Sequence, residues 1–289
     1  MSRPRVTVVG DVGLDVVCRL AAPIAPGDDT PAQITAEPGG AGANTAARLA
    51  GLGPQVELIA RVGDDDAGRT ARAELTARGV RCRWVVDPIR PTCRVVVLVG
   101  ADGERTMVSD RGANAALAPE DVVLTAPERP GHLHLSGYVL LDRGSRPAGL
   151  AVLERARRAG WTTSVDPQSA AGLTAVGAAA FLDWIRGVDV LLPNDAELDA
   201  LGGPVSALAA VGAVAVTHGR YGASWFCGTD RRRAPANRTV RADSTGAGDA
   251  FDAGFLAAWL AGAAPADALA AGNAAGTDAA GTRGARGHG

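Results

Sequence analysis

Residues 243–251, Asp-Ser-Thr-Gly-Ala-Gly-Asp-Ala-Phe, combine small residues with a carboxylate where an apolar helix is expected to begin. Backbone N–H groups in the first turn of a helix have no partner within the helix and lie at its positive end. A Gly-Ala-Gly turn at that place can therefore bind phosphate oxygens. Asp249 falls in the same turn. An ordinary helix cap is the alternative, because Asp is favoured at helix starts whatever the function, and the segment by itself leaves both interpretations open.

Other polar side chains follow expected strands or open expected helices. Asp11 and Asp15 follow the first apolar run, and ligands of open α/β sheets bind beyond the carboxyl ends of the strands. Asn44 enters an Ala-rich helix after several glycines, and Asn194 stands three residues before Glu197 at the start of a short helix. The structural alternatives are a turn for Asp15, helix entry for Asn44 and a helix cap for the later pair.

In their order along the chain, these segments resemble the signatures of the PfkB (ribokinase-like) carbohydrate kinase family. Residues 243–249 are similar to its C-terminal signature D-[ST]-x-G-A-G-D. The other matches are the glycine signature Gly39-Gly40-Ala41-Gly42-Ala43-Asn44, the segment Val62-Gly63-Asp64-Asp65-Asp66-Ala67-Gly68, the N-x-x-E motif Asn194-Asp195-Ala196-Glu197, the T-x-G-x-x-G loop Thr217-His218-Gly219-Arg220-Tyr221-Gly222, and Asn273. They extend from about residue 5 to residue 285, and the chain's 38 glycines cannot produce that order by chance.

The resemblance implies ATP-dependent phosphorylation of a hydroxyl on a sugar or a sugar-like alcohol. Asp249 would be the base that accepts the hydroxyl proton. The N–H groups of Gly246, Ala247, Gly248 and Asp249 would form the anion hole for the transferred charge. Mg²⁺ would relieve the repulsion between carboxylate and phosphates, organised through water by Glu197 with Asn194, because Mg²⁺ tends to keep its waters.

The resemblance also implies the remaining binding residues. Asp15 and Asn44 would hold acceptor hydroxyls, since carboxylate and amide groups form paired hydrogen bonds with vicinal hydroxyls. The glycines expected beside the acceptor are Gly39, Gly40 and Gly42, and Asp11 is a further candidate. The nucleotide would lie against Asn194, Thr217, Gly219, Gly222 and Asn273. Asp243 is the candidate ligand of a monovalent cation such as K⁺.

Departures from the ribokinase pattern leave the acceptor open. Ribokinases typically have Lys where this chain has Ala41, and Glu after the strand where this chain has Ser136-Gly137-Tyr138. Ribose itself is therefore not the expected acceptor, and Asp11, Arg105, Asp110 or Arg111 could recognise a different one. A nucleoside kinase of the same family is the first alternative, and a catalytically silent sugar- or nucleotide-binding regulator is the second. A dinucleotide-dependent oxidoreductase is disfavoured, because Gly10 and Gly13 do not supply a GxGxxG that opens a helix.

The elements that must position these residues alternate between strand and helix. Apolar runs at residues 5–9, 56–60, 132–136, 162–166, 188–192 and 213–217 are separated by helical patterns such as residues 41–52 and 67–78. This alternation, with the resemblance, predicts an α/β ribokinase-like fold: a doubly wound, mostly parallel sheet with helices on both faces and a small β lid. We expect one domain over residues 1–289, with lid segments at about 16–37 and 81–110. Because a small open sheet exposes edges and an apolar face, we expect a homodimer through the lid.

Composition narrows the classes of partner. The 289 residues include 29 Lys+Arg against 31 Asp+Glu, a formal charge of −2, which argues against nucleic acid as a partner. All basic residues are Arg, so a Schiff-base lysine and a P-loop lysine are excluded. No apolar run is long enough to span a bilayer and no signal-peptide pattern opens the chain, so we expect a cytoplasmic protein that does not bind membranes. Its partner is expected to be a small molecule.

Overall fold

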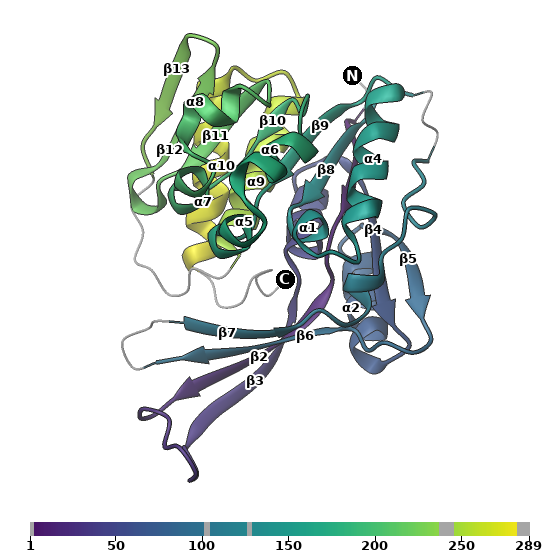
Figure 1. The fold of residues 1–289 in the computed structure, drawn as a ribbon, viewed down its shortest axis with the longest axis vertical. Coiled ribbons are helices and arrows are strands. Elements are labelled where there is room, and N and C mark those ends of the chain that lie inside the picture. The colour runs from purple at the N-terminus through teal and green to yellow at the C-terminus, as the bar shows by residue number, and fades with distance from the viewer. Residues whose placement is uncertain (1–2, 101–104, 126–128, 237–245, 282–289) are drawn as a thin grey trace.

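Short apolar strands, most of them followed by a helix, form a nine-stranded sheet in the computed structural model, which describes residues 3–100, 105–125, 129–236 and 246–281 (Figure 1). Seven strands run parallel, and the last two form an antiparallel hairpin at one edge. The spatial order is β13 (Asp230–Ala234), β12 (Ala223–Cys227), β11 (Ala213–Thr217), β10 (Val190–Leu191), β9 (Thr162–Asp166), β8 (His132–Ser136), β1 (Arg5–Val9), β4 (Gln55–Gly63) and β5 (Arg81–Asp87).

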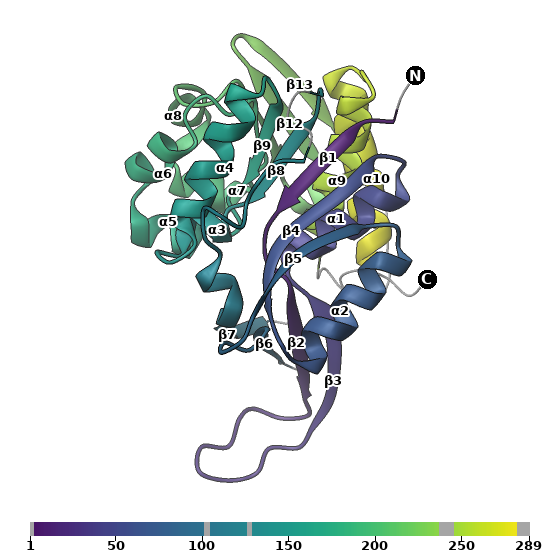
Figure 2. The ribbon, with the colours of Figure 1, turned by 90° about the vertical axis from the view of Figure 1, so that its right-hand side faces the viewer.

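Helices cover both faces of this sheet (Figure 2). One face carries α1 (Ala41–Gly51), α2 (Asp66–Ala77), α9 (Ala247–Leu260) and α10 (Pro265–Gly281). The other carries α3 (Tyr138–Leu141), α4 (Arg146–Arg158), α5 (Ala170–Val176), α6 (Ala178–Trp184), α7 (Asp195–Ala200) and α8 (Gly203–Leu208). The doubly wound α/β architecture expected from the sequence is confirmed.

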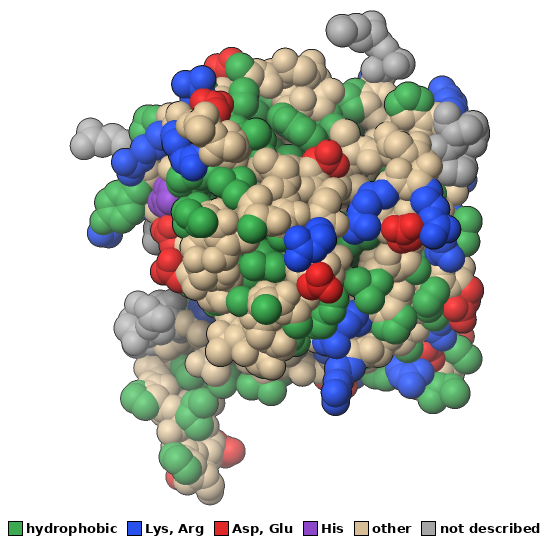
Figure 3. Space-filling view, turned by 45° about the horizontal axis from the view of Figure 1, so that its top comes forward, with side chains coloured by type: hydrophobic (Ala, Val, Ile, Leu, Met, Phe, Trp, Pro, Cys, Tyr) green, Lys and Arg blue, Asp and Glu red, His purple; other side chains and the backbone are tan. Residues whose placement is uncertain are grey.

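A second, four-stranded sheet projects from one end of the body (Figure 1), and we call it the small sheet. Its order is β3 (Ala32–Gly39), β2 (Gly13–Leu20), β6 (Cys93–Val99) and β7 (Arg105–Asp110). The projecting part at the lower left of Figure 3 carries hydrophobic side chains together with some acidic ones, and Arg and acidic side chains are interspersed over the body. Among the described helices, none has the length and apolar character needed to cross a membrane.

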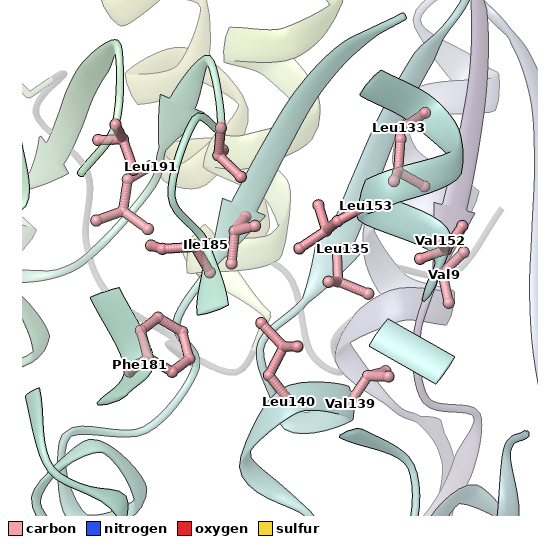
Figure 4. Close-up of a cluster of buried hydrophobic side chains, with 14 of the residues drawn as sticks. Val9, Leu133, Leu135, Val139, Leu140, Val152, Leu153, Phe181, Ile185 and Leu191 are labelled. Carbon is pink, nitrogen blue, oxygen red and sulfur yellow. The ribbon is translucent and has the colours of Figure 1, made fainter. Parts of the chain in front are cut away.

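The core lies in two layers, one on each face of the large sheet. Successive residues of a buried strand point to opposite faces, so Val8 of β1 packs with α1 and α9 while Val9 packs with α4. The α4 side is shown in Figure 4, where Leu133 and Leu135 of β8 point toward Leu153. Both faces of the parallel strands are therefore buried, which explains their continuous apolar runs.

One strand assignment from the sequence is wrong. Residues 81–86 were expected in the lid, but β5 joins the large sheet, pairing in parallel with β4. Helix α2 supplies the crossover that a parallel pair requires, so β4, α2 and β5 form a βαβ unit. The small sheet also contains a parallel pair, with Gly13 of β2 opposite Cys93 of β6, rather than antiparallel pairs alone.

Candidate active site

The N-terminus of α9 opens into a cavity of about 170 Å³. Gly246 is its N-cap residue, with a φ of 71° that favours glycine, and no side chain in the described part of the chain caps the helix. The first intrahelical bond runs from the Ala250 N–H to the Gly246 carbonyl, 2.9 Å away. The cavity is lined by Asp166, Gln168, Leu192, Asn194, Glu197, Thr217, Gly246, Gly248, Asp249 and Asp252.

Asp249 and Asn44 meet although 205 residues separate them. The Asn44 side-chain amide donates to Oδ2 of Asp249 across 2.9 Å, and both side chains are buried. Helix α1 brings Asn44 and α9 brings Asp249, and the two helices pack on the same face of the sheet. Asp249, the candidate base, and Asn44, a residue expected to contact the acceptor, therefore lie side by side at the cavity.

The carboxylate of Asp11 accepts hydrogen bonds from other groups of the protein. The donors are the N–H of Ala41 (3.0 Å), the N–H of Gly42 (3.4 Å) and the Ser136 hydroxyl (2.9 Å). The N-cap of α1, Gly40, has no side chain, so Asp11 takes over the capping of that helix from the preceding strand end. The structure thus gives Asp11 an anchoring contact beside the site, and its contact to the acceptor stays a prediction.

Asp15 and Gly39 face each other across the start of the small sheet. β2 and β3 pair so that Gly13 lies opposite Gly39 and Asp15 opposite Glu37. A Cβ atom on Gly39 would overlap the carboxylate of Asp15, which would have to turn away to make room for it. Asp15 is half-buried at the junction between the small sheet and the body.

Asn194 and Glu197 form a capping box on α7. The Asn194 side chain accepts from the N–H of Glu197, and the Glu197 carboxylate accepts from the N–H of Asn194, both at 2.9 Å. The capping alternative from the sequence is therefore present, yet both residues also line the cavity. Burial raises the pKa of Glu197.

The residues expected to bind nucleotide lie in different settings. Thr217 lines the cavity, and Gly219 and Gly222 adopt positive φ values of 54° and 96° in the loop that follows. Asn273 lies elsewhere: its amide donates to the carbonyls of Ala234 (3.0 Å) and Pro235 (3.1 Å), joining α10 to the end of β13. Asp243 lies outside the described residues.

Three polar residues that the sequence analysis did not assign also line the cavity: Asp166, Gln168 and Asp252. Burial raises the pKa of Asp166 well above its usual value, and the neighbouring carboxylates of Glu197 and Asp249 add to the effect. Burial and the carboxylate of Asp166 raise the pKa of Asp252 in the same way. Asp166 ends strand β9, and Asp252 lies one helical turn after Asp249, so strand-end position and helical spacing were the available signals.

Gln168 holds the carboxylate of Asp166 at both oxygens. Its backbone N–H donates to Oδ1 (2.9 Å) and its side-chain amide to Oδ2 (2.6 Å). Its φ of 72° is unusual for a residue other than glycine, and such strain is found where the surroundings over-determine a conformation. No sequence signal marks this conformation.

The cavity suits a divalent cation together with phosphates. Four carboxylates line its described wall, and Oδ2 of Asp252 is buried with no hydrogen-bond partner among the described residues. Clustered carboxylates repel one another unless protons or a cation intervene. The described residues contain no group of three or more His, Cys, Asp or Glu side chains placed to hold a metal ion.

An open helix N-terminus beside a buried carboxylate, on a doubly wound sheet, defines an α/β phosphotransferase. Over residues 3–288 the chain matches the pfkB family of carbohydrate kinases. It is 36% identical over 291 residues to an ATP-dependent ribose-1-phosphate kinase of Halopiger xanaduensis, which covers 98% of this chain and 94% of the relative. The chain belongs to the pfkB family, and it is an ATP-dependent carbohydrate kinase.

Two solved structures are similar along nearly their whole length. The adenosine kinase of Sinorhizobium meliloti has a TM-score of 0.87 at 25% identity, covering 99% of this chain and 96% of its own. The fructokinase of Vibrio cholerae O395, in its fructose, ADP and calcium ion bound form, has a TM-score of 0.81 at 26% identity, with 99% and 96% covered. The ribokinase-like fold expected from the sequence is therefore confirmed.

Proposed function

We propose that the chain transfers the γ-phosphate of ATP to a hydroxyl held between Asn44 and Asp249. The observation that carries the proposal is their 2.9 Å hydrogen bond at the N-terminus of α9, which no side chain of the described residues caps. Asp249 accepts the hydroxyl proton, and Asn44 keeps its carboxylate turned toward the acceptor. The N–H groups of residues 246–249 stabilise the charge on the transferred phosphoryl group.

In this proposal, Mg²⁺ would neutralise part of the negative charge of the phosphates. The residues that would hold it through water are Glu197 and Asn194, with Asp166 and Asp252 on the same wall of the cavity. Gln168 orients Asp166 through both carboxylate oxygens. The proposal is supported by the unpartnered oxygen of Asp252 and by the calcium ion bound by the Vibrio fructokinase.

The acceptor we propose is a pentose that carries a phosphate group, with ribose 1-phosphate as its first representative. The 36% identity to a ribose-1-phosphate kinase, spread over almost all of both chains, supports this assignment. The absence of the ribokinase Lys and Glu at Ala41 and Ser136-Gly137-Tyr138 agrees with an acceptor other than ribose.

A screen of ATP consumption tests the acceptor. Ribose 1-phosphate, ribose, fructose, a keto-deoxy sugar acid and adenosine are each offered with MgATP, and ADP formation is measured. We expect the highest kcat/KM with ribose 1-phosphate. Preference for adenosine would instead support the nucleoside kinase that the Sinorhizobium structure suggests, and no turnover with any acceptor would support the silent regulator.

Two finer proposals concern a cation and a second subunit. We propose that K⁺ raises turnover through Asp243, and replacing K⁺ by tetramethylammonium in the assay tests it. We also propose a homodimer through the small sheet. The support for the dimer is the exposure of apolar side chains on its strands, with Ile34 64%, Met107 57% and Val108 60% exposed.

A further inference from the structure

Arg111 carries a buried donor without an acceptor. It stands between β7 and the short 3₁₀ helix Gly112–Ala116, where the small sheet joins the body. Its Nε atom is buried and has no hydrogen-bond partner among the described residues. The carboxylate of Asp142 lies 3.9 Å from Nε, close enough for electrostatic attraction but too far for a hydrogen bond. A buried N–H without an acceptor is costly, so its retention calls for a partner.

The guanidinium is held in place by an aromatic ring. The centre of the Arg111 guanidinium lies 5.1 Å from the centroid of Tyr138, within the range of a cation–π contact. Tyr138 belongs to the segment Ser136-Gly137-Tyr138, where ribokinases carry Glu. Because the stack fixes the plane of the guanidinium, its donors are oriented before any ligand arrives, and that fork matches phosphate and carboxylate oxygens.

Arg111 lies among the acceptor residues. The pKa of Tyr138 is raised to about 12, first by burial and then by the carboxylates of Asp11, Asp166 and Asp249, while the charge of Arg111 opposes the rise. The pKa of Cys93 is likewise raised to about 11, first by burial and then by the carboxylates of Asp11 and Asp15, while the charge of Arg111 lowers it. The charge of Arg111 thus acts on Tyr138 together with those of Asp11 and Asp249, and on Cys93 together with those of Asp11 and Asp15.

The charge balance of this region sets the chemistry of the acceptor. Asp11, Asp15 and Asp249 repel any negatively charged ligand, and the repulsion is strong in a partly buried site. A neutral sugar would need only the hydrogen-bonding carboxylates and amide. An anionic acceptor needs a cation on the same side, and Arg111 supplies one with a free donor.

We propose that Arg111 binds the anionic group of the acceptor and makes the enzyme selective for a phosphorylated sugar over its neutral parent. The inference rests on the proposed function, which it deepens by naming the residue that recognises the acceptor phosphate. In this arrangement the phosphate lies at the small-sheet end of the site, and the hydroxyl to be phosphorylated lies at the Asp249 end.

The test compares Arg111→Gln and Arg111→Lys with the wild type, using ribose 1-phosphate and ribose as acceptors. Arg143→Gln is the matched control, because Arg143 is exposed and follows Asp142 in the sequence. We expect Arg111→Gln to lower kcat/KM for ribose 1-phosphate by about 10- to 100-fold, mainly through KM, because one charge-assisted contact is lost. The KM for ATP and kcat/KM for ribose should change less than about 3-fold, and Arg111→Lys should restore part of the loss.

Inorganic phosphate gives a readout that does not depend on turnover of the phosphorylated sugar. We expect phosphate to inhibit the wild type competitively against the acceptor, and to inhibit Arg111→Gln at least several-fold more weakly. Melting temperatures of all variants identify a general folding defect, which would weaken ATP and both acceptors together.

The outcomes separate the two proposals. If ribose 1-phosphate is phosphorylated but Arg111→Gln affects both acceptors equally, or neither, the role of Arg111 is overturned and the proposed function stands. If the wild type instead prefers the keto-deoxy acid and Arg111→Gln selectively loses it, the proposed acceptor fails and the anion-binding role of Arg111 stands. A preference for neutral ribose or adenosine overturns both.

Discussion

At the scale of single residues, the site depends on side chains that hold one another in place. Asn44 donates to Asp249, and Gln168 holds both carboxylate oxygens of Asp166. Each pair joins a group that can act on phosphate or hydroxyl to a neighbour that limits its rotation. Such preorganisation lowers the entropic cost of aligning the hydroxyl with the γ-phosphate.

Replacing Asp249 by Asn tests whether this side chain accepts the hydroxyl proton, because the substitution keeps its shape. The amide keeps the size and much of the hydrogen bonding of the carboxylate but cannot accept the hydroxyl proton. We expect kcat to fall by about 10² to 10⁴-fold, the typical contribution of a general base, while ATP binding measured by calorimetry stays close to wild type. Turnover within a few-fold of wild type, with chemistry limiting the rate, would remove Asp249 from this role.

At the scale of elements, the start of α1 is built around a residue from another segment. The helix has glycine at its N-cap, and the carboxylate of Asp11 at the end of the β1 segment accepts its first N–H groups. Gly40 has a φ of 95°, and a Cβ atom there would lie 2.6 Å from the Asp11 carbonyl oxygen. The close approach sets the direction of α1 and therefore the position of Asn44 one turn later.

Gly40→Ala should disturb both stability and the acceptor site. We expect a loss of about 1–3 kcal/mol in the free energy of unfolding, from a non-glycine residue in this conformation, with a higher acceptor KM as Asn44 moves. Gly51→Ala is the control at the other end of α1, where a Cβ atom meets nothing within 4 Å. That control should be neutral or stabilising by up to about 1 kcal/mol. Urea unfolding and steady-state kinetics measure both, and equal effects of the two substitutions would contradict the argument.

At the scale of the whole molecule, the candidate binding residues are divided between the body and the small sheet. Asp249 and Glu197 lie on helices that pack on the large sheet, at the cavity, whereas Asp15 lies on the small sheet and Arg111 follows its last strand. The two faces of the small sheet differ: Val17, Val97 and Val99 are buried on one, while Ile34 and Val108 are exposed on the other. An exposed apolar face of this kind favours contact with a second copy.

The expected dimer can be measured by light scattering. The chain has a mass of 29.1 kDa, so a stable dimer should give about twice that value at micromolar concentration. Val108→Glu and Ile34→Glu together should shift the species toward the monomer, because burying a charge in an apolar interface is costly. A wild type that remains a monomer with and without ligands would refute the dimer.

The buried histidines of β8 make stability depend on pH. Burial lowers the pKa of His132 to about 3 and that of His134 to about 4, from an ordinary value of 6.5. The unfolded chain binds protons below pH 6.5 while these folded side chains stay neutral, so stability rises with pH in this window. Their contribution is complete above about pH 7 and is lost as pH falls from 6.5 toward 4, at up to about 1.4 kcal/mol per pH unit for each histidine.

Substitution of one histidine isolates this effect from the carboxylates. His132 is hydrogen-bonded to Thr162 and Ser164, and Gln can retain part of that bonding. We expect the free energy of unfolding in urea to change less steeply between pH 6 and pH 5 in His132→Gln than in the wild type, by about 1 kcal/mol per pH unit. An unchanged slope would show that His132 is already protonated in the folded protein.

The sequence by itself determined the family, the α/β alternation and the helix start that carries Asp249. These are local properties, because each can be identified within a few residues: the periodicity of apolar residues, a glycine in a turn and a carboxylate in the first turn of a helix. The same reasoning predicted the ends of β1, β8 and β9 correctly. It also located the two partners of the Asn44 and Asp249 contact as separate motifs, without showing that they touch.

Only the tertiary structure decided which distant residues meet. Strand β5 pairs with β4 because α2 makes the crossover between them. The carboxylate of Asp11 accepts a hydrogen bond from the start of α1, and the amide of Asn273 donates one to the end of β13. Asp166, Gln168 and Asp252 enter the site because β9 and α9 end and begin at the same edge of the sheet. Such contacts depend on strand order and on helix packing across the sheet, which no short stretch of sequence encodes, because each segment's partner is chosen by the burial of the whole fold.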